Sequence, residues 1–238
     1  MRTLLVGLAL LVAVTSYPAA ASARSPARVV DVVQVNGLID PPTVSYVEAR
    51  LAAAQASPSD EAVIVELDSQ GGLVGSMSTM VKRILESEVP VVVWVAPRGA
   101  QAASAATLLV YAASLSYMAE TTTLGAATPV NLNARESPHP VVGRTAALLR
   151  RLAGGGSRPP ALLIRSGSSL TSSQAVHAGV IDGVASSLAE LLQGMDGHTV
   201  KLADGKSVRL ETWDQQNHRP SVGFRFEGMN VFGRLLHS

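Results

Sequence analysis

Strongly apolar runs alternate with amphipathic stretches in the first half of the chain. The runs at residues 29–35, 62–67 and 89–96 are rich in valine and isoleucine, which is typical of strands buried on both faces. Residues 43–55 and 73–87 lie between them and carry apolar side chains three or four positions apart, which predicts helices. This alternation predicts βαβ units, and therefore an α/β fold with parallel strands covered by helices.

The pattern is less regular beyond the third strand. Residues 100–113 are rich in alanine and predict a helix, residues 116–119 predict a short strand, and residues 121–125 predict a turn. The polar, proline-containing residues 131–140 predict a loop, and residues 141–152 predict a helix. Further on, a hairpin is expected around Asp204-Gly205, followed by a tail without clear periodicity.

The N-terminus has the three parts of a secretory signal peptide. Arg2 supplies a positive charge, residues 4–14 are apolar apart from one glycine, and Ala21-Ser22-Ala23 supplies small residues for cleavage. We expect a signal peptide at residues 1–23, a main domain at 24–193 and a C-terminal hairpin and tail at 194–238. The mature protein is then exported, and is soluble or peripherally membrane-associated; a retained N-terminal anchor is the alternative.

Composition narrows the class of function. Hydrophobic residues make up 47% of the 238 residues and charged residues 16%, as in a globular protein. The net charge of +1 argues against a nucleic-acid partner, which requires a concentrated basic field. The chain has no cysteine, which excludes a disulfide framework, a thiol nucleophile and a cysteine-based metal site. We predict no cofactor and no metal.

Two joints made of small residues are candidates for chemistry. In Asp68-Ser69-Gln70-Gly71-Gly72, glycines follow a strand and let backbone N–H groups face outward, although a plain tight turn would look the same. In the second joint, Ser104 lies among alanines after the third strand, where its hydroxyl is either exposed or packed on the sheet. Both joints follow sequential strands, so we expect them at the same sheet edge. A hydroxyl beside backbone donors is the arrangement for acyl transfer.

At these residues the chain resembles the NfeD-type membrane-bound serine proteases, relatives of the Clp protease subunit and of signal peptide peptidase A. The similar stretches are VVDVVQVNGLID, AVIVELDSQGG, VPVVVWVAPRGAQAASAA, YMAETTTLGAATPV and SGSSLTSSQAVHAGVIDGVASSLAELLQGMDG. The resemblance implies a crotonase-like spiral of ββα units. It also implies that Ser104 is the nucleophile, that Gly71, Gly72 and Ala105 form the oxyanion hole, and that the protein self-associates.

The chain departs from the family where a general base is needed. Such proteases usually have proline at the position of Gln70, glycine at the position of Ala106, and a lysine at or near the position of Pro140. No lysine occurs between Lys82 and Lys201. Arginine cannot replace it, because a guanidinium keeps its proton and has no lone pair to accept another. His139 is the nearby candidate base; a solvated loop histidine is the alternative reading.

Two hypotheses follow for the function. The first is an exported serine endopeptidase that uses Ser104, with His139, a group from another subunit or an unaligned residue as the base. The second is a catalytically impaired module that binds polypeptide, or acts as a scaffold, on the same fold. In both cases the expected partner is a polypeptide, in particular a hydrophobic segment, and a membrane protein and a second copy of the chain are further candidates.

Overall fold

The computed structural model describes residues 28–125 and 169–227, and it confirms the alternation of strands and helices in the first half of the chain. The elements in chain order are β1 (Val29–Ile39), α1 (Pro41–Gln55), β2 (Asp60–Gly72), α2 (Val74–Leu85), β3 (Val91–Val95), β4 (Gln101–Ala103), the 3₁₀ helix η1 (Ser104–Ala106), α3 (Thr107–Ala112), β5 (Leu115–Met118), β6 (Thr123–Gly125), β7 (Ser169–Thr171), α6 (Ser172–His177), β8 (Gly183–Val184), α7 (Leu188–Met195), β9 (Thr199–Lys201), β10 (Ser207–Arg209), β11 (Trp213–Asp214), β12 (Arg219–Pro220) and β13 (Gly223–Glu227).

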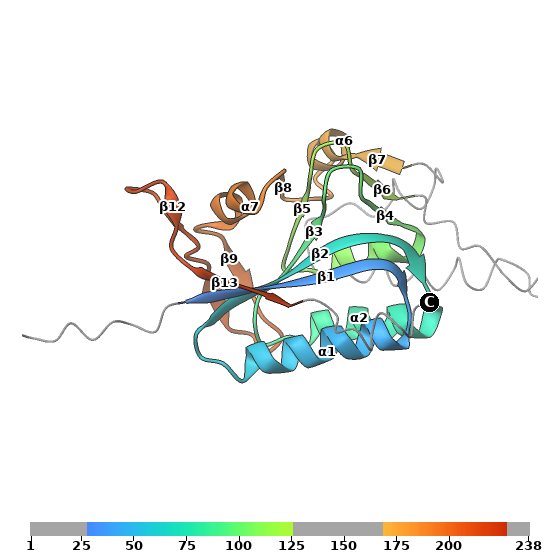
Figure 1. The fold of residues 1–238 in the computed structure, drawn as a ribbon, viewed down its shortest axis with the longest axis horizontal. Helices are drawn as coiled ribbons and strands as arrows, with labels where there is room; N and C mark the ends of the chain where they lie inside the picture. The colour runs from blue at the N-terminus through green and yellow to red at the C-terminus, as the bar shows by residue number, and fades with distance from the viewer. Residues whose placement is uncertain (1–27, 126–168, 228–238) are drawn as a thin grey trace, which may run out of the picture.

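Within the described residues the central sheet has nine strands and is almost entirely parallel. Its main path runs β7-β6-β4-β2-β3-β5-β8, and β1 joins β2 on one side and β13 on the other. Among these pairs only β6 and β7 are antiparallel. In Figure 1, α1 and α2 lie together on one side of the sheet, and α7 lies on the other. The predicted α/β class is therefore confirmed.

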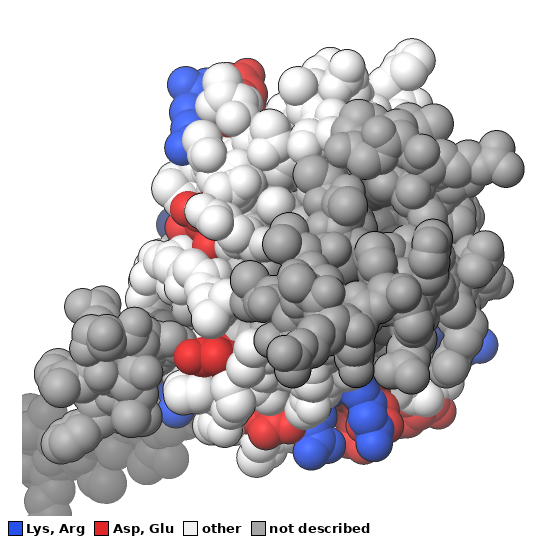
Figure 2. Space-filling model, turned by 90° about the vertical axis from the view of Figure 1, so that its right-hand side faces the viewer, with Lys and Arg blue, Asp and Glu red and all other residues white. Residues whose placement is uncertain are grey.

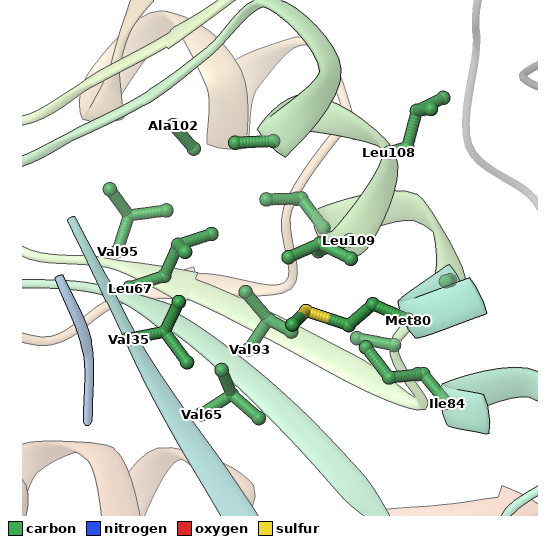
Figure 3. Close-up of a cluster of buried hydrophobic side chains, with 14 of the residues drawn as sticks. Val35, Val65, Leu67, Met80, Ile84, Val93, Val95, Ala102, Leu108 and Leu109 are labelled. Atoms are coloured by element: carbon green, nitrogen blue, oxygen red, sulfur yellow. The ribbon is translucent and has the colours of Figure 1, made fainter. Parts of the chain in front are cut away.

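Buried apolar side chains fill both sides of the sheet. On one side, valines of β1, β2 and β3 pack against the apolar stripes of α1, α2 and α3. Figure 3 shows this cluster, with Met80 and Ile84 of α2 and Leu109 of α3 directed toward Val65 and Val93 of the sheet. On the other side, alternate residues of the same strands pack against α7 and the C-terminal region. Period-two alternation sends successive strand residues to the two faces, which explains the continuous apolar runs.

Local signals set where the first helix begins. The Asp40 side chain accepts a hydrogen bond from Thr43 N–H at 3.0 Å, and prolines occupy the first two positions of α1. Both features favour helix initiation, since the first N–H groups have no partner within the helix. The apolar positions of the predicted spacing are all buried: Val44, Val47, Leu51 and Ala54.

Three local predictions are wrong, and each error has a physical cause. The first strand was expected over residues 29–35, but β1 continues through Asn36 and Gly37 to Ile39, and a positive φ of 87° at Gly37 accommodates a register shift against β2. A single helix was expected at 100–113, but residues 101–103 form strand β4, because they pair with β6, and η1 and α3 follow. The expected turn at 121–125 contains β6 for the same reason. Sheet pairing overrides the helical propensity of alanine here.

The region after residue 194 contributes to the main sheet as well as forming the expected hairpin. β9 and β10 pair antiparallel around Asp204-Gly205, which confirms the hairpin. β13, in the expected tail, pairs in parallel with β1. The Arg225 guanidinium on β13 lies 2.9 Å from a carboxylate oxygen of the buried Asp31 and 3.3 Å from one of Asp60. The loop and helix expected at 131–152 lie outside the described residues.

Candidate active site

Residues 68–72, the glycine joint, form the irregular end of β2. Asn36 of β1 is opposite Asp68, and Leu38 is opposite Gly71, so β2 has one residue more than β1 between these pairs. Gly71 has a φ of 110°, a conformation that glycine adopts without a steric penalty. A Cβ atom on Gly72 would lie 2.0 Å from the carbonyl oxygen of Ile39. The joint therefore requires glycine at both positions.

Ser104 lies at the junction between β4 and η1. Its φ is 52°, in the left-handed region that L-residues other than Asn, Asp and His rarely adopt. The preceding strand is fixed from two sides, because Asp68 Oδ1 accepts a hydrogen bond from Gln101 N–H at 3.0 Å and Thr107 Oγ1 donates to the Ala102 carbonyl at 3.1 Å. Non-glycine residues held in this conformation cluster at functional sites.

The structure brings Ser104 and the glycine joint together. A Cβ atom built on Gly71 would lie 3.3 Å from Ser104 Cβ and 3.5 Å from Ala105 N. Gly71 and Ser104 are thus close neighbours, with no room for a larger side chain between them, although 32 residues separate them along the chain. The small size of Gly71 is what permits this approach.

The backbone donors around Ser104 face different directions. Gly71 N–H donates to Ser69 Oγ at 3.0 Å, toward β1, and Leu73 N–H donates to the Ile39 carbonyl of β1 at 3.0 Å. Gly72 is paired with Ile39 of β1, and Ile39 bonds to a residue flanking Gly72, not to Gly72 itself. In a parallel ladder of this register the Gly72 N–H faces away from β1, toward the side of β4 and η1. Ala105 N–H belongs to the first turn of a helix and has no partner within it.

No base contacts the serine within the part of the chain that the structure describes. Ser104 is partly exposed, and its Oγ forms no hydrogen bond with any residue in 28–125 or 169–227. His177 is exposed in the last turn of α6, and Lys82 is exposed on α2, 3.8 Å from Glu86. His139 lies outside the described residues, so its role as the base stays a prediction.

Two residues next to the glycines were not predicted as part of the site. The Asp68 carboxylate anchors β4, and Ser69 is buried with its hydroxyl bonded to both glycine-containing segments. The available signal was a pair of side chains capable of hydrogen bonding, separated from two glycines by one residue, at a strand end.

Apolar side chains remain exposed beside the joint. Leu38, Leu73 and Val74 are 57%, 51% and 59% exposed, and all three are within three residues of Gly37 or Gly71. Figure 2 shows the side of the molecule to which this end of the sheet belongs: both signs of charge lie along the lower edge, and its described surface has no extended patch of one sign. The three exposed apolar side chains suit contact with an apolar segment of a ligand.

Comparisons with known proteins agree with this geometry. The chain is 33% identical over 192 residues to the membrane-bound protease PH1510 of Pyrococcus horikoshii, an alignment that spans 77% of this chain and 43% of that protein. No protein-family model matches the chain.

Solved structures of the 1510-N protease are similar over most of the chain. A lysine-to-alanine mutant of this membrane-bound stomatin-specific protease, in complex with a substrate peptide, has a TM-score of 0.79 at 29% identity, covering 88% of this chain and 96% of that one. A serine-to-alanine mutant of the same protease has a TM-score of 0.75 at 29% identity, covering 85% and 99%. A further structure, of the protease specific for a stomatin homolog from Pyrococcus horikoshii, has a TM-score of 0.74.

The fold is therefore that of the Clp protease class, which confirms the predicted architecture. Within this class, the chain belongs to the NfeD-type family of membrane-bound serine proteases, as the sequence motifs implied. Among the described residues, no helix has both the length and the apolar character needed to cross a bilayer.

Proposed function

We propose that the protein is a serine endopeptidase in which Ser104 attacks the carbonyl carbon of a peptide bond. The observation that carries the proposal is the left-handed Ser104 backbone (φ of 52°) close beside Gly71, because it combines a strained hydroxyl residue with a backbone turn. The relatives with the same fold are proteases, and one of them is solved with a substrate peptide.

The chemistry proceeds in two steps. Ser104 Oγ forms a bond to the carbonyl carbon while its proton passes to a base, and the carbonyl oxygen becomes an oxyanion. We assign the stabilisation of this oxyanion to the N–H groups of Gly72 and Ala105. Gly71 contributes by its small size, which lets the glycine segment lie close to Ser104. The carbon–nitrogen bond then breaks and the amine takes the proton from the base, which completes the acylation of Ser104. In the second step water adds to the acyl carbon and gives a proton to the base, the ester carbon–oxygen bond breaks, and Ser104 Oγ takes that proton back.

The substrate is proposed to be an extended polypeptide with a hydrophobic segment. Leu38, Leu73 and Val74 offer exposed apolar contacts next to the glycine joint. An extended peptide at this position would gain backbone hydrogen bonds from the sheet end and apolar contacts from these three side chains.

Whether a general base is present decides between a serine endopeptidase and a module that only binds polypeptide. Among residues near the position where the family has lysine, His139 has a side chain that can accept a proton near neutral pH, with a reference pKa of about 6.5. The absence of any lysine between Lys82 and Lys201 favours the second candidate function, a module that binds polypeptide without cleaving it. Without a base, the oxyanion hole and binding alone retain about 10³–10⁴-fold over water, too little for peptide hydrolysis.

A serine-directed fluorophosphonate separates the two functions. The wild-type protein is expected to form one covalent adduct that Ser104→Ala abolishes and that the exposed His177→Ala retains. If His139 is the base, His139→Ala abolishes labelling, and the wild-type labelling rate falls as pH drops through about 6–7, because the imidazole becomes protonated and can no longer accept the serine proton.

The contrary result is equally informative. A wild-type protein that is not labelled at any pH, yet binds a hydrophobic peptide in a fluorescence anisotropy titration, is a binding module. Labelling that persists in Ser104→Ala excludes Ser104 as the nucleophile.

Export, membrane association and self-association belong to the same proposal. The relative is membrane-bound, which supports a membrane-protein partner or peripheral attachment for this chain. Cell fractionation and N-terminal sequencing of the mature protein test the signal peptide at residues 1–23: the expected first residue is Arg24, and recovery of Met1 would contradict it. Sedimentation velocity tests self-association, with a monomer as the contrary result.

A further inference from the structure

Ser69 has an unusual number of polar contacts for a side chain inside a strand. Ser69 is buried, with 1% of its surface exposed. The Ser69 hydroxyl donates to the Gly37 carbonyl at 2.6 Å, lies 3.2 Å from the Gly71 carbonyl, and accepts from Gly71 N–H at 3.0 Å. A single hydroxyl thus connects the bend in β1 with the bend in β2.

These contacts occur where the regular ladder between β1 and β2 is interrupted. Ser69 and Gln70 lie in the extra length of β2, between the pairs Asn36–Asp68 and Leu38–Gly71. A bulge leaves backbone groups without their regular ladder partners, and buried groups of this kind must find others. The Ser69 side chain provides the partners, as donor to Gly37 and as acceptor from Gly71.

The same contacts set the direction of the next peptide groups. Gly71 has no Cβ and a φ of 110°, so its backbone would readily adopt other conformations without a restraint. The Ser69 hydroxyl also lies 3.2 Å from the Gly71 carbonyl oxygen, which belongs to the Gly71–Gly72 peptide. Because the C=O and N–H of a trans peptide point in opposite directions, a carbonyl held toward Ser69 directs Gly72 N–H away from it, to the side of Ser104. Gly71 itself lies against Ser104, and a rotation of its peptide would change that contact as well.

We propose that Ser69 is a positioning residue: its hydroxyl fixes the orientation of the Gly71–Gly72 peptide relative to Ser104. This inference rests on the proposed function and adds a residue to it. Ser69 does not contact the reacting atoms and acts through the two glycines. Removing the hydroxyl leaves the strand and core in place but frees the donor segment to rotate, which matters because small misplacements of a catalytic group are costly.

The test compares Ser69→Ala with Ser69→Thr, which keeps the hydroxyl, and with Thr212→Ala. Thr212 is a matched control, because it is fully buried and its hydroxyl donates to the Leu192 carbonyl at 2.6 Å, in the C-terminal region. The readouts are the second-order rate of fluorophosphonate labelling at Ser104, the melting temperature, and amide hydrogen exchange of Gly71 by NMR.

We expect Ser69→Ala to lower the labelling rate about 10- to 100-fold. Thr212→Ala should lower the melting temperature by a similar amount and keep the wild-type labelling rate, and Ser69→Thr should restore the rate to within about threefold of wild type. The proposal is overturned if Ser69→Ala labels at the wild-type rate, if Thr212→Ala loses labelling equally, or if Ser69→Thr labels no faster than Ser69→Ala.

Hydrogen exchange keeps this test separate from the proposed function. If the wild-type protein is not labelled, the proposed peptidase activity fails, and the role of Ser69 is decided by exchange alone. Faster exchange of the Gly71 amide in Ser69→Ala, with wild-type exchange in Thr212→Ala, supports the positioning role. Unchanged exchange in Ser69→Ala overturns it.

Discussion

The interior of the sheet and its end at the glycine joint obey different rules. In the interior, Val63, Ile64 and Val93 are fully buried, and regular parallel pairing connects their strands. At the glycine joint, Ser104 has a strained backbone, and large apolar side chains such as Leu73 are left exposed. Interior residues are explained by packing alone, whereas those at the joint reduce stability without a packing benefit. Such local costs are typical of functional sites.

The largest loss of stability is expected from a substitution at Gly72, where the glycine joint has no room for a side chain. Gly72→Ala would place a Cβ 2.0 Å from the Ile39 carbonyl oxygen, so the backbone of β1 or β2 must move. We expect a loss of about 3 kcal/mol or more in the free energy of unfolding, together with loss of labelling at Ser104. Gly75→Ala is the matched control, because a Cβ there meets nothing within 4 Å. It should be neutral or stabilise α2 by up to about 1 kcal/mol in urea denaturation.

In the interior, a cavity should reduce stability without affecting the chemistry. Ile64→Ala removes a fully buried side chain and is expected to cost about 2–5 kcal/mol in urea denaturation. Labelling of the folded fraction at Ser104 should keep its wild-type rate. A labelling rate that falls while the protein is still folded would show that interior and joint are not separable.

A smaller effect is expected at Ser104, where two substitutions that both remove the hydroxyl should differ in stability because of backbone strain. Because the φ of Ser104 is 52°, Ser104→Gly should be more stable than Ser104→Ala by about 0.5–1 kcal/mol. At an unstrained position the order would be reversed, since glycine has the more flexible unfolded chain. Chemical denaturation of the two variants measures the difference, and a more stable alanine variant argues against strain.

The smallest effect concerns the exposed apolar residues. Leu73 is the N-cap residue of α2 and makes no side-chain capping bond, so Leu73→Ser should stabilise the helix by about 0.5–1 kcal/mol. The same change should weaken binding of a hydrophobic peptide about 5- to 10-fold by anisotropy, because apolar contact area is lost. Leu85→Ser, at the other end of α2, should leave binding unchanged. Equal weakening in both variants would contradict a peptide site at the joint.

The sequence allowed the interior to be predicted better than the joint. Apolar periodicity reports burial directly, so β1, α1, β2, α2 and β3 were expected near their observed positions. β4 was missed because alanines have high helical propensity and its pairing with β6 depends on tertiary structure. β13 was missed because Arg225 interrupts its apolar residues. Its buried partner Asp31, a charge within the run VVDVVQV, was the available signal.

The candidate site was predictable in outline only. Ser104 and the glycines could be placed at one sheet edge, because the ends of parallel strands lie together. The left-handed Ser104 and the direction of the Gly71 N–H could not, since the first occurs where β4 passes into η1 and the second depends on the register shift between β1 and β2. Ser69 was not singled out because a serine before two glycines also fits an ordinary turn.

Ser104 Oγ and the N–H groups of Gly72 and Ala105 are expected to converge on one carbonyl group of the substrate, with Oγ at its carbon and the two N–H groups at its oxygen. A crystal structure of the protein after reaction with a hydrophobic peptidyl boronic acid tests this most directly. We predict a bond between boron and Ser104 Oγ, with one boronate oxygen about 2.7–3.1 Å from both nitrogens. Boron bound elsewhere, or a boronate oxygen directed away from Gly72 and Ala105, would contradict the account.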